Sequence, residues 1–256
     1  MEEKIVYHIA RTRDELEQAF SLVYKEYAFK GYIPSGYKSK MRISLYNALP
    51  STTSFVAKRG KTVLATVTLI PDSPMGIPMD KIYSKELLSF RNRKLRIAEV
   101  SQLSIDSSIY PKGWFSMFNF SKLIFVFKLF KLVFDYSRLV DKIDELCIAV
   151  NPKHQYLYKF IFFEIFGKLK YYGSVNKAPA LALHLSINKG LEEKSKRRIG
   201  VNKIFYGSTT SPEVFKGKFI FKKSDLEYFF IKKSNLFKQA EQKQLNYLRK
   251  CYGRAI

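Results

Sequence analysis

The chain has 256 residues, and 46% of them are hydrophobic, so it can bury a substantial core in one large domain or in a domain with an extension. Its 45 Lys and Arg residues against 22 Asp and Glu residues give a formal net charge of +23. Such a surface attracts an acidic partner, which can be nucleic acid, an anionic membrane or an acidic protein, and charge alone does not choose among them.

The sequence carries no pattern typical of a metal site or of a disulfide framework. Its two cysteines, Cys147 and Cys251, form no CxxC motif, and its three histidines are scattered. The first residues lack the basic and apolar regions of a signal peptide, and charged residues interrupt the long apolar region 114–139. We therefore expect a cytoplasmic protein without a metal, with peripheral contact to the anionic inner membrane as an added option.

Hydrophobic periodicity and turn residues predict an order of elements along the first 187 residues. Thr12-x-x-Glu15 is a capping box that opens an amphipathic helix, and two β-branched runs around Arg59-Gly60-Lys61 predict a hairpin. The prediction in chain order is strand 4–10, a helix from residue 12, a short helix, strands 52–58 and 62–70, loop 71–78, helix 80–92, strand 95–106, helix 116–139, strand 145–150, helix 153–166, and one or two strands over 168–187.

These elements predict an α/β (α+β) fold, in which a mixed sheet is covered by helices on both faces. Antiparallel strands come first and strand–helix alternation follows, an order that resembles the GNAT acyltransferase fold. From residue 188 the chain becomes basic and loop-rich, with 17 Lys and Arg residues against 6 Asp and Glu residues. We expect a GNAT-like core over residues 1–187 and a basic helical extension over residues 188–256, which serves as a lid or a docking element.

The predicted strand 95–106 sets one acidic residue, Glu99, among apolar neighbours. Strict alternation would place Glu99, Ser101, Leu103 and Ile105 on one side of the strand, and Ala98, Val100, Gln102 and Ser104 on the other. A carboxylate between Ala98 and Val100 is partly desolvated, which raises its proton affinity and suits it to accept a proton from an attacking amine. The alternative is a carboxylate on a solvated face, or one paired with a nearby Arg or Lys.

Three stretches of the sequence resemble the bacterial N-acyl amino acid synthases, a family related to the acyl-homoserine-lactone (autoinducer) synthases. The resemblance spans residues 6–187 and implies the GNAT-like core that both families share. Its motifs are Val-Tyr-Lys-Glu-Tyr-Ala-Phe-Lys-Gly-Tyr-Ile at 23–33, Thr-Ser-Phe-Val-Ala at 53–57, and Gly-Ile-Pro-Met-Asp-Lys-Ile-Tyr at 76–83 running on to Ala-Glu-Val-Ser-Gln-Leu at 98–103.

The resemblance implies transfer of a long-chain acyl group from the phosphopantetheine thioester of an acyl carrier protein to the α-amine of an amino acid. No bound cofactor is needed, because the acyl-phosphopantetheine thioester is itself the activated donor. Glu99 would act as general base, and Ser101 would orient it or polarise the thioester carbonyl. The strand amides of Leu103, Ser104 and Ile105 would stabilise the developing oxyanion.

Two departures from related enzymes bear on the substrates. The early acidic pattern that serves S-adenosylmethionine in autoinducer synthases is missing, which argues against homoserine-lactone synthesis. The pyrophosphate loop of ordinary GNAT enzymes is reduced to a single glycine, Gly113. Lys112, Gly113 and the following helix N-terminus would suffice for one pantetheine phosphate, which favours a carrier protein over CoA. An ordinary surface turn at Lys112-Gly113 explains the same residues equally well.

The basic surface offers a docking site for an acidic acyl carrier protein. Arg93 and Arg96, with Arg91, are candidates for the carboxylate of the amino acid or for the carrier phosphate, although solvated charges explain each of them as well. Phenylalanines can line an acyl tunnel, while core packing accounts for most of them. The docking candidates are Lys122, Lys128, Lys131, Lys153, Lys196, Arg197 and Arg198, and the tunnel candidates are Phe118, Phe120, Phe125, Phe127, Phe130, Phe162 and Phe163.

Two other functions stay open at this stage. One is a GNAT-like transferase that uses acyl-CoA or a different amine. The other is a non-catalytic basic protein that binds nucleic acid or an anionic membrane. The sequence lacks an aromatic RNP motif and a GXXG clamp, so nucleic acid is the less favoured partner.

Overall fold

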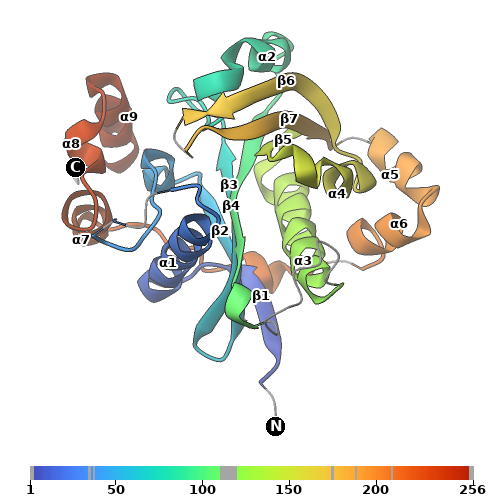
Figure 1. The fold of residues 1–256 in the computed structure, drawn as a ribbon, viewed down its shortest axis with the longest axis horizontal. Coiled ribbons are helices and arrows are strands. Elements are labelled where there is room, and N and C mark those ends of the chain that lie inside the picture. The colour runs from blue at the N-terminus through green and yellow to red at the C-terminus, as the bar shows by residue number, and fades with distance from the viewer. Residues whose placement is uncertain are drawn as a thin grey trace.

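The computed structural model describes residues 3–33, 36, 38–109, 120–173, 176–187, 189–208 and 210–253. Seven strands form one sheet, and helices cover it on both sides (Figure 1). The strands are β1 (Ile5–Ile9), β2 (Thr53–Arg59), β3 (Thr62–Pro71), β4 (Ile97–Ile105), β5 (Glu145–Val150), β6 (Glu164–Tyr172) and β7 (Ala178–Ser186). The α-helices are α1 (Arg13–Phe29), α2 (Asp80–Asn92), α3 (Phe120–Tyr136), α4 (Gln155–Phe160), α5 (Lys189–Lys196), α6 (Ile199–Phe205), α7 (Lys223–Glu227), α8 (Leu236–Gln239) and α9 (Gln242–Tyr252).

The sheet is mixed, and its strand order is β1-β2-β3-β4-β5-β7-β6. All neighbouring pairs are antiparallel except β4 and β5, which run parallel. A parallel pair needs a crossover, and here α3 supplies it. The predicted hairpin is confirmed, with Gly60 at φ +55° in its turn, a conformation that glycine adopts without strain. The predicted mixed sheet is therefore confirmed.

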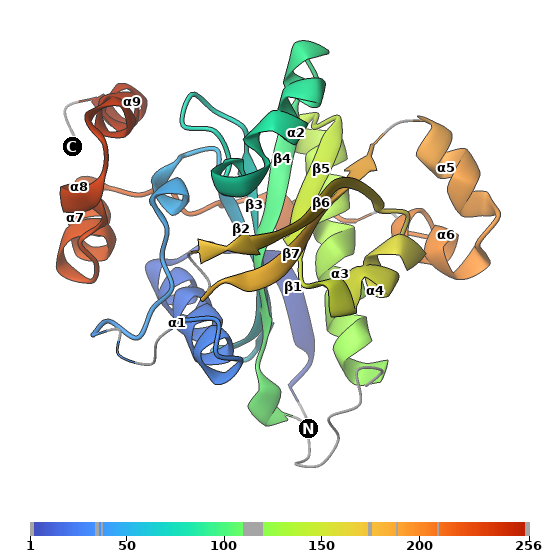
Figure 2. The same cartoon turned by 45° about the horizontal axis from the view of Figure 1, so that its top comes forward.

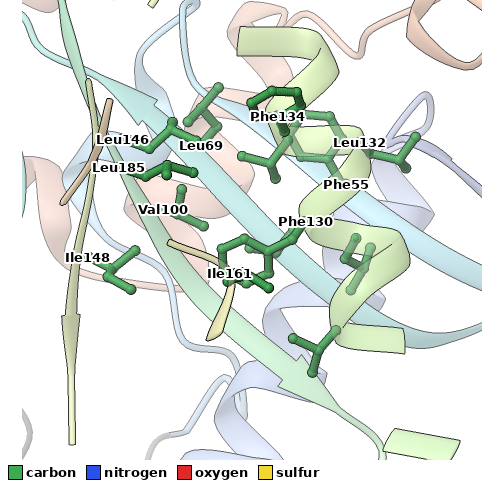
Figure 3. Packing of buried hydrophobic residues seen from close by; sticks show 14 of the residues in the cluster. Phe55, Leu69, Val100, Phe130, Leu132, Phe134, Leu146, Ile148, Ile161 and Leu185 are labelled. Carbon is green, nitrogen blue, oxygen red and sulfur yellow. The ribbon is translucent and has the colours of Figure 1, made fainter. Parts of the chain in front are cut away.

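One face of the sheet packs against α3 and its neighbours. Phe130 and Phe134 of α3 belong to one buried cluster with Phe55 of β2, Val100 of β4 and Leu185 of β7 (Figure 3). All five side chains are buried, and pairs of rings such as Phe130 and Phe163 meet edge to face. α4, α5 and α6 extend this cluster. Of the phenylalanines considered for a tunnel, Phe125, Phe130 and Phe163 are core residues, and Phe127 and Phe162 are partly buried against the cluster.

The opposite face packs against α1, α2 and the C-terminal helices. Phe20 of α1 and Tyr83 of α2 are among its largest fully buried side chains. Phe229 and Phe230, from the π-helical turn η7 (Tyr228–Lys232), join the same cluster. Helices thus bury apolar surface on both faces of the sheet.

The described part of the chain after residue 187 is largely helical, and it contacts both faces of the core. α5 and α6 lie beside α3, whereas α7, α8 and α9 lie on the far side of the sheet, near α1 (Figures 1 and 2). Phe205 joins the first cluster and Phe221 the second. The segment between them follows β1, where Phe219 N–H donates to the Ala10 carbonyl at 3.0 Å. The domain boundary at residue 187 stays a prediction.

One predicted helix is wrong over half of its length. Helix 153–166 ends at Phe160, and strand β6 already begins at Glu164. Phe162 sits between them at φ +69°, a left-handed conformation that ends the helix. An apolar run such as Phe-Ile-Phe-Phe fits a helix or a strand equally well, and pairing with β7 decides for the strand.

Among the described residues, no helix is both long and apolar enough to cross a membrane. The same residues contain no group of three His, Cys, Asp or Glu side chains that could hold a metal ion.

We predict that Gly167→Ala destabilises the protein by about 1–3 kcal/mol, because overpacking a buried contact forces its neighbours apart. A Cβ at this position would lie 2.8 Å from the Tyr83 ring and 2.9 Å from the Ala182 Cβ. Gly200→Ala is the control, since a Cβ there meets open space within helix α6. Urea unfolding of both variants checks this prediction, and equal stabilities would contradict it.

Candidate active site

Strand β4 carries a bulge in its second half. Ser101 pairs with Thr68 of β3 and Ser104 pairs with Thr66, so two residues of β4 face one residue of β3. Gln102, the first of the two, adopts φ +54°. A bulge shifts the alternation of side chains by one position. Gln102 therefore joins Glu99 and Ser101 at one pocket, while Leu103 packs on the core of the opposite face.

The pocket opens where β4 and β5 separate. The two strands pair only at their beginnings, over Ile97 to Glu99 of β4. Beyond this point Ser101 and Gln102 line one wall of the pocket, and Ala149 and Val150 of β5 line another. β6 and β7 form a hairpin that crosses the long strands obliquely (Figures 1 and 2).

The pocket has a volume of about 190 Å³, and most of its lining comes from aromatic and small apolar side chains. Four tyrosines surround it, and burial raises the pKa of Tyr27 and of Tyr46 to about 12, so both hydroxyls remain protonated at neutral pH. The lining residues are Tyr27, Tyr32, Arg42, Ser44, Tyr46, Pro78, Lys81, Glu99, Ser101, Gln102, Ala149, Val150, Asn151, Tyr172, Ala178, Pro179 and Ala180.

Glu99 is the buried carboxyl group of this pocket. Glu99 is 4% exposed, and its burial raises the pKa of the carboxyl group from 4.5 to about 8. The Met79 N–H donates to its Oε2 at 2.6 Å, and the Ser101 hydroxyl bonds to it as well; both contacts favour the charged form. A carboxyl group with a pKa near neutral, next to a cavity, is suited to general acid–base chemistry.

The cationic side chains of the pocket are Arg42 and Lys81. Lys81 follows Asp80 at the start of α2, and its charge lowers the pKa of Glu99 slightly. Arg42 is half-buried in the segment after α1, where its N–H donates to the Phe20 carbonyl at 2.9 Å. A substrate with a negative group can therefore meet a cation while its reacting atom faces Glu99.

Comparison with known proteins identifies the family. The family model of FeeM, an N-acyl amino acid synthase, matches residues 18–186, which is more than half of the chain. The chain belongs to the FeeM family of N-acyl amino acid synthases. This membership makes it an acyltransferase.

Solved structures agree with this assignment. FeeM from uncultured soil microbes is 32% identical, with a TM-score of 0.61, over 73% of this chain and 92% of FeeM. The acyl-homoserine-lactone synthase LasI is 17% identical, with a TM-score of 0.55, over 82% of this chain and 98% of LasI. The CoA-dependent acyl-homoserine lactone synthase BjaI is 16% identical, with a TM-score of 0.53, over 77% and 90% of the two chains. The last two show the shared fold alone. A search of curated proteins gave no match.

The arginines expected to meet a carboxylate lie elsewhere in this FeeM-family chain. Arg91 forms ion pairs with Asp72 and Asp80, at 2.7 and 2.6 Å. Arg93 is exposed and lies over the Phe90 ring, and Arg96 pairs with Asp144 at 3.5 Å. None of them lines the described pocket. The structure places Arg42 and Lys81 there instead.

The basic residues expected to dock a partner differ in their surroundings. Lys128, Lys153 and Arg197 are exposed, and Lys196 pairs with Glu193 at 2.7 Å. The side chain of Lys131 is 13% exposed, and its ammonium donates to Asp135 and to the Phe205 carbonyl, so these internal contacts occupy it. Arg198 is exposed, and its guanidinium donates to the Phe160 carbonyl at 3.0 Å. Lys112, Gly113, Phe118 and the side chains of Lys122 and Phe120 lie outside the described residues.

Sequence reasoning missed the segment Arg42 to Ala48, which supplies one wall of the pocket. It contains the short 3₁₀ helix η1 (Leu45–Ala48), all four of whose residues are buried. The signal available in the sequence was Asn47, a polar residue within an otherwise apolar turn. The structure shows that it is buried, and buried amides need specific partners. Its partner, Gln102, lies 55 residues away in the sequence.

We predict that Glu99→Gln stabilises the protein relative to the wild type as pH rises. Between its ordinary pKa of 4.5 and its folded pKa of about 8, Glu99 keeps a proton that the unfolded chain has released. Stability is therefore lost as pH rises through this window, and the glutamine is free of this loss. From pH 6 to pH 9.5 the advantage of the variant grows by about 3 kcal/mol.

Urea unfolding of the wild type and the variant at both pH values measures this difference. Glu145→Gln is the matched control, because Glu145 is a buried carboxylate of the adjacent strand that accepts hydrogen bonds from Ser186 and His184. An advantage of Glu99→Gln that is the same at both pH values would show that Glu99 titrates in its ordinary range.

Proposed function

We propose that the protein transfers a long-chain acyl group from the phosphopantetheine thioester of an acyl carrier protein to the α-amine of an amino acid. The observation that carries this proposal is the buried carboxyl group of Glu99 at the separation of β4 and β5. Membership of the FeeM family supports the reaction class. The nature of the donor and the length of the acyl chain are our inference from the residues around the site.

Glu99 would act as the general base. The amine nitrogen attacks the thioester carbonyl carbon and gives up a proton to the Glu99 carboxylate, directly or through a water. The C–S bond then breaks, and the phosphopantetheine thiolate leaves and takes up a proton. The thioester is already activated, so positioning and proton removal suffice and no covalent enzyme intermediate is needed.

The bulge of β4 would stabilise the oxyanion that forms on the thioester carbonyl. A bulge interrupts the ladder of hydrogen bonds and leaves its extra residue without a partner on the neighbouring strand. The break lies at Gln102 and Leu103, directly after the strand residues that hold Glu99 and Ser101. We assign the role of donor to the amides of Leu103, Ser104 and Ile105, which lie beyond the last residue of β4 that pairs with β5. Ser104 and Ile105 keep their register with β3, so the sheet preorganises this stretch before charge develops.

Arg42 and Lys81 would bind the carboxylate of the acceptor amino acid. Both line the same pocket as Glu99, from the wall and from the start of α2. An amino acid held by its carboxylate would present its α-amine to Glu99, and the tyrosines would contact its side chain. This proposal replaces Arg93 and Arg96, which lie outside the pocket.

The donor would dock through exposed basic residues. Lys112 and Gly113 would meet the single phosphate of phosphopantetheine. Lys128, Lys153, Arg197 and Arg198 are exposed cations, and they would attract an acidic carrier protein by charge. A formal net charge of +23 strengthens this attraction over a long range at low salt.

We predict that Glu99→Gln lowers kcat/KM for acyl transfer by about a hundredfold or more, since the amide keeps the shape of the side chain and removes the base. The assay combines long-chain acyl carrier protein with a mixture of amino acids, and mass spectrometry detects the N-acyl products. Acyl-CoA is offered in parallel, and Glu145→Gln controls for the loss of a buried carboxylate that does not line the pocket.

Each outcome of this assay decides one part of the proposal. Product from the carrier protein, lost in Glu99→Gln and kept in Glu145→Gln, is the expected result. Product from acyl-CoA alone would replace the donor. Turnover of Glu99→Gln at the wild-type rate would remove Glu99 from the mechanism.

We also predict that Lys81→Met raises the KM for an amino acid about tenfold or more and leaves the KM for the corresponding decarboxylated amine unchanged. The reason is that only the amino acid offers the carboxylate that Lys81 is proposed to bind. Steady-state kinetics with such a pair of acceptors measures both values. Equal effects on the two acceptors would place the carboxylate away from Lys81.

A further inference from the structure

One wall of the pocket is formed by Arg42, Ser44 and Tyr46, and we call residues 42–48 the acceptor wall. Ser44 and Tyr46 line the cavity, and the 3₁₀ turn η1 holds them. Glu99 and Ser101 line the same cavity. Any shift of this turn therefore changes the space in which the acceptor lies.

An amide pair ties the acceptor wall to the bulge of β4. Asn47 Nδ2 donates to Gln102 Oε1 at 3.0 Å, and Gln102 Nε2 donates to Asn47 Oδ1 at 3.2 Å. Gln102 Nε2 also contacts the Arg42 carbonyl at 3.3 Å. Asn47 and Gln102 are 3% and 8% exposed, so water does not compete effectively for these bonds.

Asn47 also orders the turn to which it belongs. Its Oδ1 accepts hydrogen bonds from the Ser44 N–H and the Ser44 hydroxyl, both at 2.8 Å. One buried side chain thus connects the wall residue Ser44 with the residue at the bulge. Together with the contact from Gln102 to the Arg42 carbonyl, this side chain links the acceptor wall to β4.

The C-terminal helix supports the same turn from behind. The Tyr252 hydroxyl, at the end of α9, donates to the Ala48 carbonyl at 2.6 Å. The buried side chains of Phe229, Phe230 and Leu248 belong to the same apolar cluster as Tyr46 and Ala48. The Lys218 ammonium donates to the Pro50 carbonyl at 2.7 Å, just after the turn.

This support comes from outside the region that matches the family model, which ends at residue 186. Within the matched region, Asn47 contacts the wall and the bulge. Beyond it, Tyr252 fixes the residue next to Asn47. The added segment therefore acts on the pocket through a defined hydrogen bond as well as through general packing.

We propose that Asn47 is a positioning residue for the acceptor, and that the C-terminal segment holds it in place through the bond from Tyr252 to Ala48. This inference rests on the proposed function for the identity of the acceptor. It assigns to residues 212–252 a role in acceptor binding that the lid or docking element expected from the sequence does not include. Neither Asn47 nor Tyr252 touches the reacting atoms, so both act through the wall.

The first test compares two tyrosines of the C-terminal segment. Tyr252→Phe removes the bond to the acceptor wall and keeps the ring in place. Tyr228→Phe is the matched control, because its hydroxyl donates to Glu17 of α1 at 2.8 Å and does not contact the wall. We expect Tyr252→Phe to raise the acceptor KM about fivefold with the donor KM unchanged, and Tyr228→Phe to change neither.

The second test examines the amide pair. Asn47→Leu and Gln102→Leu each leave one buried amide without its partner, whereas the double variant removes both amides. We expect each single variant to raise the acceptor KM about tenfold or more, and the double variant to raise it by no more than either single one. Additive effects in this cycle would show that the two amides act independently and would overturn the proposal.

A third measurement separates failure of this inference from failure of the proposed function. Hydrogen exchange of the backbone amides in residues 42–49 reports the order of the wall without any substrate. We expect faster exchange there in Tyr252→Phe than in Tyr228→Phe, whatever the acceptor is. Equal exchange in both variants would overturn the bracing role even if the enzyme acylates amino acids as proposed.

Discussion

The separation of β4 from β5 is the constraint on which the rest of this structure depends. The two parallel strands pair over three residues and then separate. Beyond that point, the groups between them lack the usual ladder of hydrogen bonds between strands. The fold tolerates this opening because large apolar clusters hold each strand from outside. A carboxyl group that would be destabilising in a closed sheet can lie at the opening, buried and hydrogen-bonded by Met79 and Ser101.

The positive charge of the surface and the charges near the opening act differently. Most of the excess positive charge lies on exposed side chains, where solvent screens it and where it acts at long range. Near the opening, Arg91 is neutralised by Asp72 and Asp80, which leaves the field at Glu99 to a few nearby groups. Of the described residues, Arg42 and Lys81 are the cations that line the pocket, whereas Arg91 is held by its two aspartates.

Much of the fold follows from local sequence patterns, and the site follows from them only in part. Helix 80–92 and strand 145–150 are observed as predicted, because periodicity, turn residues and apolar runs agree there. Glu99 was predictable because its immediate neighbours are apolar. The bulge was not, since a glutamine gives no sign that it will adopt a positive φ. The pair of Asn47 and Gln102 depends on contacts between distant segments, which no short pattern encodes.

The bond from Tyr252 to Ala48 joins residues 204 positions apart in the chain. Contacts of such long range form late during folding, because the loop that they close is entropically costly until the intervening structure is in place. On the ribosome, the turn beside the pocket would already be synthesised while its brace is still missing. The pocket would then be complete only after α9 has been synthesised and has packed on the core, so a chain truncated before Tyr252 would lack this bond and a fixed position for the acceptor.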